Sequence, residues 1–346
     1  MRKLAGLALI VVISFAFFGC AKKAAGPTEG IGNSLVLYSS MTENDLTNLI
    51  KGFAEVHPNV KIEVVNGSAG ELTARIAAEA SNPQGDLMWG GLNNSDGDTY
   101  KDLFEPWLSE HEVDIIDAYK SNNGFYNLDH LSTTVFCVNT DLEKELGLNI
   151  QGYADLLNPA LKGRIVLSDP NSSSAAWNNV ANIMAVYGND SPQAWQLIEN
   201  LLRNDMVIVT SSSVCFRAVG DGEYVVGLTY EDGASTLLKS GAKNVKMVYP
   251  AEGASSFAFG LAVIKNAPHM EAAKAMVDYL QSPEGQSYMG NALGTLRFTN
   301  RNSQYDSPYL PPDSTINWVT RDIDWLIKNK EQVLARWNQI YTSIRR

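Results

Sequence analysis

The chain has 346 residues, of which 45% are hydrophobic, and its formal net charge is −11. This length and apolar content predict a folded protein with room for two domains and exclude a disordered chain. Acidic residues are in excess, with 38 Asp and Glu against 27 Lys and Arg. The composition therefore does not favour the basic surface that nucleic-acid binding requires. We therefore expect no nucleic-acid partner.

The first residues predict export. Arg2 and Lys3 precede an apolar run from Leu4 to Phe18. The run is too short to cross a membrane as a helix, for which about 20 residues are needed, but it fits the apolar region of a signal peptide.

The end of the apolar run predicts a lipid anchor. Gly19 and Cys20 close the run and resemble the lipobox of bacterial lipoproteins, with Phe17 where Leu is usual. We expect a signal peptide at 1–19, lipidation of Cys20 and a tether over 20–33. The alternative is an ordinary cleaved signal in which Cys20 has no role. After cleavage 25 basic residues face 38 acidic ones, a net charge of −13, so a lipid rather than surface charge would attach the chain to a membrane.

The first third of the remaining chain alternates between strand and helix patterns. Thr42 and Asp45 form a capping-box pair that starts a helix, and Pro58 ends it. The expected strands are 35–38, 60–64 and 86–89, and the expected helices are 42–54 and 71–80. This order predicts a parallel sheet with helices on both faces.

The same alternation returns in the second half of the chain. The expected strands are 164–167, 206–209, 224–229 and 257–264, and the expected helices are 175–187, one from 192, 214–219, 270–280, and one or two within 318–344. Two apolar stretches, 132–139 and 255–264, have the pattern of crossings between lobes. We expect lobe one at 34–132 plus 256–300 and lobe two at 133–255 plus 301–346.

Four loops that join a strand to a helix are built from small or hydroxyl residues. They are Ser39-Ser40, Gly67-Ser68-Ala69-Gly70, Asn171-Ser172-Ser173-Ser174 and Thr210-Ser211-Ser212-Ser213. The free N–H groups of a helix's first turn attract anions, and serine adds a hydroxyl donor. Plain N-capping is the alternative for any single loop. Because ligands of open α/β sheets bind beyond the carboxyl ends of the strands, four such loops favour an anion site between the lobes.

Two further strand ends carry candidate site residues. Trp89-Gly90-Gly91 permits close approach of the backbone, although Trp89 is equally expected in the core. Tyr230-Glu231-Asp232-Gly233 places carboxylates where they suit sugar hydroxyls or an amine, and a solvated turn is the alternative.

Motifs of catalysis and of metal binding are not found. The sequence has no Gly-x-Ser-x-Gly, GxxxxGK[ST], GxGxxG or HExxH, and we interpret His57, His111, His130 and His269 as surface residues. Cys137 and Cys215 form either a disulfide or two buried thiols, and their spacing does not decide between these.

Several segments together resemble the solute-binding proteins of ATP-driven (ABC) importers, in the ferric-ion-binding branch. They are residues 35–39, 67–72, 85–91, 161–165, 222–224 and 282–286. The resemblance covers about 34–340. It implies a two-lobed α/β fold of the type II periplasmic-binding-protein kind, in which two α/β sandwich lobes are joined by a two-strand hinge. It also implies a bound solute, no catalysis, no cofactor, a monomer, and delivery to a permease with its ATPase.

The resemblance also bears on the ligand. Iron-binding members use a histidine in the first loop, a glutamate after the third strand and twin tyrosines in lobe two. Here the first loop reads Ser39-Ser40-Met41-Thr42, Gly91 stands where the glutamate would be, and Glu231-Asp232-Gly233 replaces the tyrosine pair. The matching anion-binding positions, Ser172, Ser173, Ser212 and Tyr230, remain. The pattern is similar to members that take up hexose phosphates or aminoethylphosphonate.

We therefore expect a protein that binds a small solute bearing a phosphate or phosphonate. The candidate ligand-binding residues are Ser39, Ser40, Ser68, Ala69, Gly70, Gly90, Ser172, Ser173, Ser212, Tyr230, Glu231 and Asp232. A ferric-ion binder and an enzyme on the same fold are the alternatives. No metal ligand is assigned.

Overall fold

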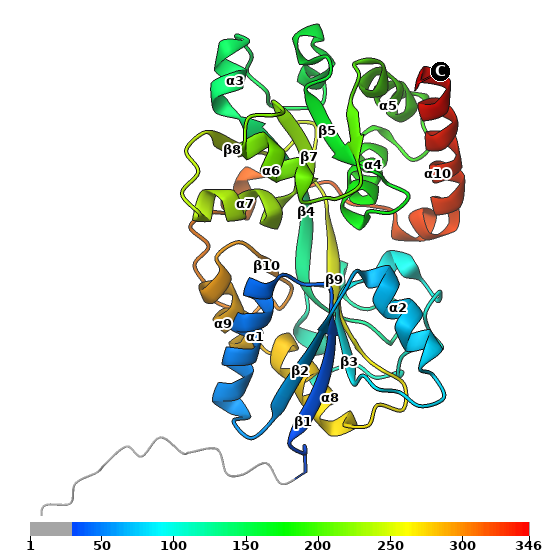
Figure 1. Ribbon diagram of the computed structural model, residues 1–346, viewed down its shortest axis with the longest axis vertical. Coiled ribbons are helices and arrows are strands. Elements are labelled where there is room, and N and C mark those ends of the chain that lie inside the picture. Colours follow the sequence, from blue (N-terminus) through cyan, green and yellow to red (C-terminus); the bar gives the residue numbers. More distant parts are fainter. Residues whose placement is uncertain (1–29, 346) are drawn as a thin grey trace, which may run out of the picture.

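The computed structural model describes residues 30–345, which form two lobes stacked along the long axis of the molecule (Figure 1). The expected two-lobed α/β fold is thereby confirmed. The signal peptide, Cys20 and most of the tether lie outside the described residues. Within residues 30–345, no helix combines the length and apolar character that a membrane crossing demands.

The strands alternate with helices along most of the chain. The strands are β1 (Ser34–Ser39), β2 (Lys61–Asn66), β3 (Leu87–Asn93), β4 (Asn127–Asn139), β5 (Ile165–Ser168), β6 (Val207–Val209), β7 (Val226–Tyr230), β8 (Val245–Val248), β9 (Ser256–Val263) and β10 (Arg297–Phe298).

The helices include several that the sequence patterns did not predict, namely α3, α7 and α9. The α-helices are α1 (Glu43–Val56), α2 (Ala69–Ala78), α3 (Thr140–Glu145), α4 (Ser174–Tyr187), α5 (Pro192–Arg203), α6 (Val214–Gly220), α7 (Glu231–Lys239), α8 (Met270–Gln281), α9 (Pro283–Leu293) and α10 (Ile323–Arg345).

Lobe one is built on β2-β1-β3-β9 and the first half of β4. Strand β1 pairs in parallel with β2 and β3, and β9 runs antiparallel to β3 and β4. Leu35 and Leu37 of β1 pack against α1, α8 and α9, whereas Tyr38 packs on the opposite face with Leu72 and Ile76 of α2. Successive side chains of a strand point to opposite faces, so one apolar strand supplies both cores.

Lobe two repeats this design around β5, β6, β7 and the second half of β4. Strand β5 pairs in parallel with β6 and β7. Phe136 and Val138 of β4 join the core under α4, α5 and α10, whereas Cys137 lies on the other face with Cys215 of α6. Both cysteines are buried free thiols. Of the two alternatives left open by the sequence, a disulfide or two buried thiols, the structure shows the second. Burial raises the pKa of Cys137 to about 12 and of Cys215 to about 11.

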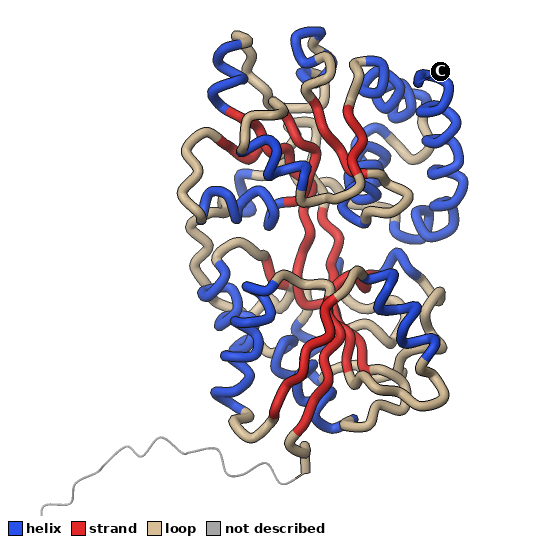
Figure 2. Tube along the Cα trace, in the orientation of Figure 1, coloured by secondary structure: helices blue, strands red, loops and turns tan. Residues whose placement is uncertain are grey.

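The lobes are connected by β4 and β9, the two strands that cross the waist of the molecule in Figure 2. In β4 the residues up to Thr133 pair with β9, and Thr134 begins the pairing with β7. The side-chain hydroxyls of Thr133 and Ser256 join the two crossing strands at 2.8 Å. The chain thus changes sheets within a single residue step, as a hinge between rigid lobes requires.

A third crossing follows β10, and here the predicted domain limits need correction. We expected 301–346 in lobe two, but Arg301 donates to the Ile115 carbonyl and Asp306 N–H donates to Asn291, both in lobe one. The chain joins lobe two only near Trp318, which forms a bridge with Ala254.

Candidate functional site

The carboxyl ends of the strands in both lobes face one cavity. Strands β1, β2, β5 and β6 each lead through a loop into a helix, and β7 leads directly into α7; residues of all five connections line the cavity. The cavity has a volume of about 460 Å³, enough for a small organic solute. It is lined by Ser40, Met41, Thr42, Asp45, Ala69, Gly91, His130, Leu131, Ser132, Ser172, Ser173, Ser174, Ala175, Thr210, Ser211, Ser212, Tyr230, Asp232, Phe259 and Leu296.

One part of the cavity, which we term the hydroxyl end, is lined from lobe two by Ser172–Ser174, Thr210–Ser212 and Tyr230. Within residues 30–345 the hydroxyls of Ser172 and Ser174 make no hydrogen bond, which leaves them available to a ligand. Ser173 is the N-cap of α4 and accepts from the N–H of Ala176 at 3.3 Å. The hydroxyl end thus combines free donors with the first turn of a 14-residue helix.

The helices that begin at the hydroxyl end have no acidic side chain in their first turns. The first turns of α4 and α6 contain no Asp or Glu, whereas those of α1, α2 and α7 each contain at least one. An acid in the first turn already compensates the partial positive charge of the helix start. The start of α4 therefore keeps its capacity for an external anion.

The opposite chemistry occurs at what we term the acidic end, formed by Asp45, His130 and Asp232. Asp45 comes from α1 and His130 from β4, both in lobe one, whereas Asp232 comes from α7 in lobe two. The described residues that line the cavity include no Lys or Arg. His130 is accordingly the cationic side chain that the described lining offers.

The titratable groups of the acidic end influence each other. Burial raises the pKa of the Asp232 carboxyl, and the nearby Asp45 carboxylate raises it further. Burial also raises the pKa of Asp45, although its hydrogen bonds from Thr42 oppose that shift. Burial disfavours the charged form of His130, but the carboxylates of Asp129 and Asp45 outweigh this, so its pKa is raised. Two carboxyls thus compete for ionisation beside one imidazole.

Seven of the predicted site residues line the cavity. They are Ser40, Ala69, Ser172, Ser173, Ser212, Tyr230 and Asp232. Tyr230 lies beside Ser212 in this lining, and burial raises the pKa of its hydroxyl well above the usual range. The loops of both lobes therefore meet around one space, as the four-loop pattern predicts.

Four other predicted residues lie beside the cavity but do not line it. Ser39 is fully buried and donates to the Trp89 carbonyl at 3.1 Å. Ser68 is the N-cap of α2, where it exchanges hydrogen bonds with Glu71. Gly70 does not reach the lining, and neither does Gly90, which acts as a spacer. A Cβ on Gly90 would lie 2.7 Å from the Ser40 hydroxyl, so glycine is what lets the first loop approach.

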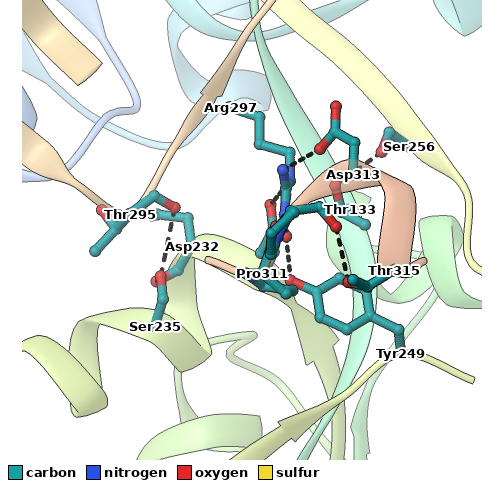
Figure 3. A network of polar contacts seen from close by, with 12 residues as sticks. Thr133, Asp232, Ser235, Tyr249, Ser256, Thr295, Arg297, Pro311, Asp313 and Thr315 are labelled. Carbon is teal, nitrogen blue, oxygen red and sulfur yellow. Dashed lines mark hydrogen bonds and ion pairs between the residues drawn. The ribbon is translucent and has the colours of Figure 1, made fainter. Parts of the chain in front are cut away.

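Glu231 was predicted to contact the solute, and the structure corrects this prediction. Its carboxylate is 1% exposed and accepts from Nε of Arg297 at 3.0 and 3.1 Å and from the Tyr249 hydroxyl. Arg297 belongs to β10 of lobe one and also binds Asp313 and, at 2.8 Å, the Pro311 carbonyl (Figure 3). Glu231 therefore ties the two lobes together, and only Asp232 faces the cavity.

The sequence interpretation missed Asp45 and His130. Asp45 was recognised only as a capping partner, and it does accept from the N–H of Thr42 at 3.1 Å. His130 was interpreted as a surface residue but is 6% exposed, with Nδ1 3.1 Å from a carboxylate oxygen of Asp129. Its place on an apolar crossing strand, directly after an aspartate, was the available signal. Gly91, at the strand end where the sequence indicates close backbone approach, lines the cavity, and its φ of +78° and the 2.3 Å from an added Cβ to Ala69 require glycine there.

Comparison with known proteins gives one consistent picture. The family described as bacterial extracellular solute-binding protein matches residues 48–310. Among curated relatives, Iron uptake protein A1 of Synechocystis sp. is 27% identical, with 81% of each chain covered. Among solved structures, the periplasmic binding protein AfuA from Actinobacillus pleuropneumoniae, with fructose 6-phosphate bound, is 25% identical (TM-score 0.77, 90% of this chain and 99% of that chain). The periplasmic binding protein P5PA is also 25% identical (TM-score 0.76, 90% and 100%).

Proposed function

We propose, for a chain that belongs to the bacterial extracellular solute-binding proteins, that its cleft captures a small organic solute bearing a phosphate or phosphonate group. The protein is a solute-binding component of an ABC importer, whose permease and ATPase receive the solute. The solute binds between the lobes, with its anionic group at the hydroxyl end and its remainder toward the acidic end.

The observation that carries this proposal is the contrast among the helix starts. The first turn of α4 has no acid of its own and opens at Ser172–Ser174, where hydroxyl and backbone donors converge. Phosphate oxygens are well matched to such a set because they accept several hydrogen bonds at once. AfuA, a relative of similar fold, holds fructose 6-phosphate, which supports the same ligand class here.

Loss of one hydroxyl tests this proposal. A hydrogen bond to a charged group contributes about 1.5–3 kcal/mol, so Ser172→Ala and Ser212→Ala should each weaken binding of fructose 6-phosphate or 2-aminoethylphosphonate by about ten- to a hundredfold in calorimetric titration. Ser191→Ala is the matched control, because Ser191 caps α5 away from the cleft. It should lower stability by about 1 kcal/mol and leave the affinity unchanged. Intact affinity in both cleft variants would contradict the anion site.

Ferric iron is the second candidate solute. Tyr230, Asp45 and Asp232 offer oxygen ligands in the same cavity, and the relative in Synechocystis is named for iron uptake. Against iron, residues 30–345 contain no cluster of three or more His, Cys, Asp or Glu side chains that could hold a metal. We expect colourless protein without stoichiometric iron. A red protein with a tyrosinate-to-iron absorption band would overturn this expectation and favour the second candidate.

The membrane attachment is also a proposal. We expect a diacylglyceryl group on Cys20 and a monomeric exported protein that the lipid holds at the membrane. In a detergent phase separation the native protein should enter the detergent phase and a Cys20→Ala variant the aqueous phase. Finding both in the aqueous phase would contradict the anchor.

A further inference from the structure

The acidic end is assembled from both lobes. Asp45 lies in the first turn of α1 in lobe one and Asp232 in the first turn of α7 in lobe two, and the two helices lie on the same side of the molecule (Figure 1). Both carboxyls line the same cavity, and the charge of Asp45 contributes to the raised pKa of Asp232. A ligand group between them would contact lobe one and lobe two together.

One polar atom at this end lacks a partner in the described part of the chain. Oδ1 of Asp232 is buried without a hydrogen bond, whereas Nδ1 of His130 lies 3.1 Å from a carboxylate oxygen of Asp129. Asp45 is 3% exposed, and its carboxylate uses Oδ2 for the N–H and hydroxyl of Thr42. Buried polar groups are normally paired, so the free oxygen of Asp232 indicates a ligand that supplies a hydrogen-bond donor to this carboxylate.

The charges around the acidic end do not balance. Asp45, Asp129 and Asp232 face His130, which leaves a negative surplus. The further charges nearby are committed elsewhere. Glu231 and Arg297 pair with each other, and Lys239 donates to the Leu293 and Ala292 carbonyls at 2.6 and 3.2 Å.

A solute with a phosphate and no cation would add negative charge to this surplus. Two carboxylates in one low-dielectric site stay ionised together only when a positive charge compensates them. An ammonium supplies that charge together with three N–H donors, which neutral hydroxyl groups do not do.

We propose that the cleft selects a phosphate or phosphonate that also carries an ammonium group, and that this ammonium binds between Asp45 and Asp232. This inference rests on the proposed function and narrows it to zwitterionic solutes. Because each carboxylate belongs to a different lobe, the ammonium also joins the lobes when the solute binds. Burial and the charge of Asp45 raise the pKa of the Asp232 carboxyl, so the ammonium, which favours the ionised form, releases the proton of Asp232 into the solvent.

The test compares two ligands that differ in the ammonium alone. 2-Aminoethyl phosphate and n-propyl phosphate have the same number of heavy atoms, with a methyl group in place of the ammonium in the second. Calorimetric titration should show 2-aminoethyl phosphate binding about tenfold or more tightly. Titrations in buffers of different ionisation enthalpy should show proton release with 2-aminoethyl phosphate and none with n-propyl phosphate.

Two variants assign this preference to the carboxylates. In Asp45→Asn and in Asp232→Asn, the affinities for 2-aminoethyl phosphate and n-propyl phosphate should differ by no more than about threefold. This decrease corresponds to the loss of most of one charged hydrogen bond. Asp232→Asn leaves the Thr42 capping box intact, so one variant keeps the fold of α1. Glu43→Gln is the matched control, since it removes a carboxylate from the same turn of α1 on the exposed side and should keep the full preference.

The outcomes distinguish failure of the ammonium site from failure of the proposed phosphate-binding function. Equal affinity for the two esters in the native protein would overturn the ammonium site and leave the phosphate site standing. A preference that survives in both Asn variants would also overturn it. If neither ester nor inorganic phosphate binds, the proposed function fails and the ammonium site with it.

Discussion

The hydroxyl end and the acidic end of the cleft are both formed where helices begin, yet the helix starts are used in opposite ways. At the acidic end, α1 and α7 carry Asp45 and Asp232 in their own first turns, so each helix start is compensated from within the chain. At the hydroxyl end, α4 begins with serines and has no acid there. The start of a helix thus attracts an external anion only where no acidic side chain in its first turn compensates the partial positive charge.

This contrast has a consequence for how the cleft is held together. The acidic end lies beside the Glu231–Arg297 pair, which joins lobe two to lobe one, whereas the hydroxyl end is built within lobe two. Changes at the acidic end should therefore affect stability and lobe movement, and changes at the hydroxyl end should affect mainly affinity.

Removal of Arg297 should destabilise the protein strongly. Arg297→Met leaves the Glu231 carboxylate buried without its cation, and breaking a buried pair in this way costs about 3–5 kcal/mol. Chemical denaturation measures the loss. Arg203→Met is the control, because Arg203 pairs with Glu199 on the exposed face of α5 and should cost less than about 1 kcal/mol. A similar small loss in both variants would show that the interlobe pair contributes little.

The acidic end should make stability depend on pH. Because the pKa of Asp232 is raised on folding, the folded chain holds a proton that the unfolded chain has lost above pH about 4, the ordinary value for Asp. Stability from this group is thus present at low pH and is lost as the pH rises through the folded pKa. Asn does not ionise, so Asp232→Asn should not lose stability as the pH rises. The ligand-free variant should be about 1–3 kcal/mol more stable than the native protein at pH 7.5 and differ little from it at pH 4.

Melting curves of the native and Asp232→Asn proteins across this pH range check the expectation. Ser191→Ala should lower the melting temperature equally at every pH, since it removes a neutral cap on α5. An Asp232→Asn variant that is less stable than native at pH 7.5 would show that the ionised carboxylate stabilises the empty cleft.

How far the sequence predicts this molecule depends on whether the signal is local. The alternation of apolar residues in β1 and the capping box of α1 are decided by neighbours along the chain, and both are present in the structure. The hydroxyl loops were predicted for the same reason, because a serine-rich turn between strand and helix has few other arrangements.

The acidic end was out of reach because its parts are distant in the sequence. Asp45, His130 and Asp232 meet only through the fold, and each has an ordinary interpretation when considered alone. Glu231 and Asp232 illustrate the limit. They are adjacent, but each step along a helix turns by about 100°, so one faces Arg297 and the other the cavity. The run of acids predicted a site without indicating which carboxylate belongs to it.

The smallest expected effect, a change in molecular dimensions, tests whether the two ends act together. Inorganic phosphate reaches the hydroxyl end, whose hydroxyls come from lobe two, and has no group for Asp45 in lobe one. It should therefore bind without drawing the lobes together. 2-Aminoethyl phosphate reaches both ends and should favour rotation of the lobes about β4 and β9 into the closed arrangement. Small-angle scattering at saturating ligand should show a smaller radius of gyration with 2-aminoethyl phosphate than with phosphate or no ligand. Asp45→Asn should abolish the difference, because closure then brings no paired charge to the ammonium, whereas Glu43→Gln should keep it. An equal decrease with phosphate alone would show that the hydroxyl end closes the cleft by itself, and that the acidic end selects the solute without moving the lobes.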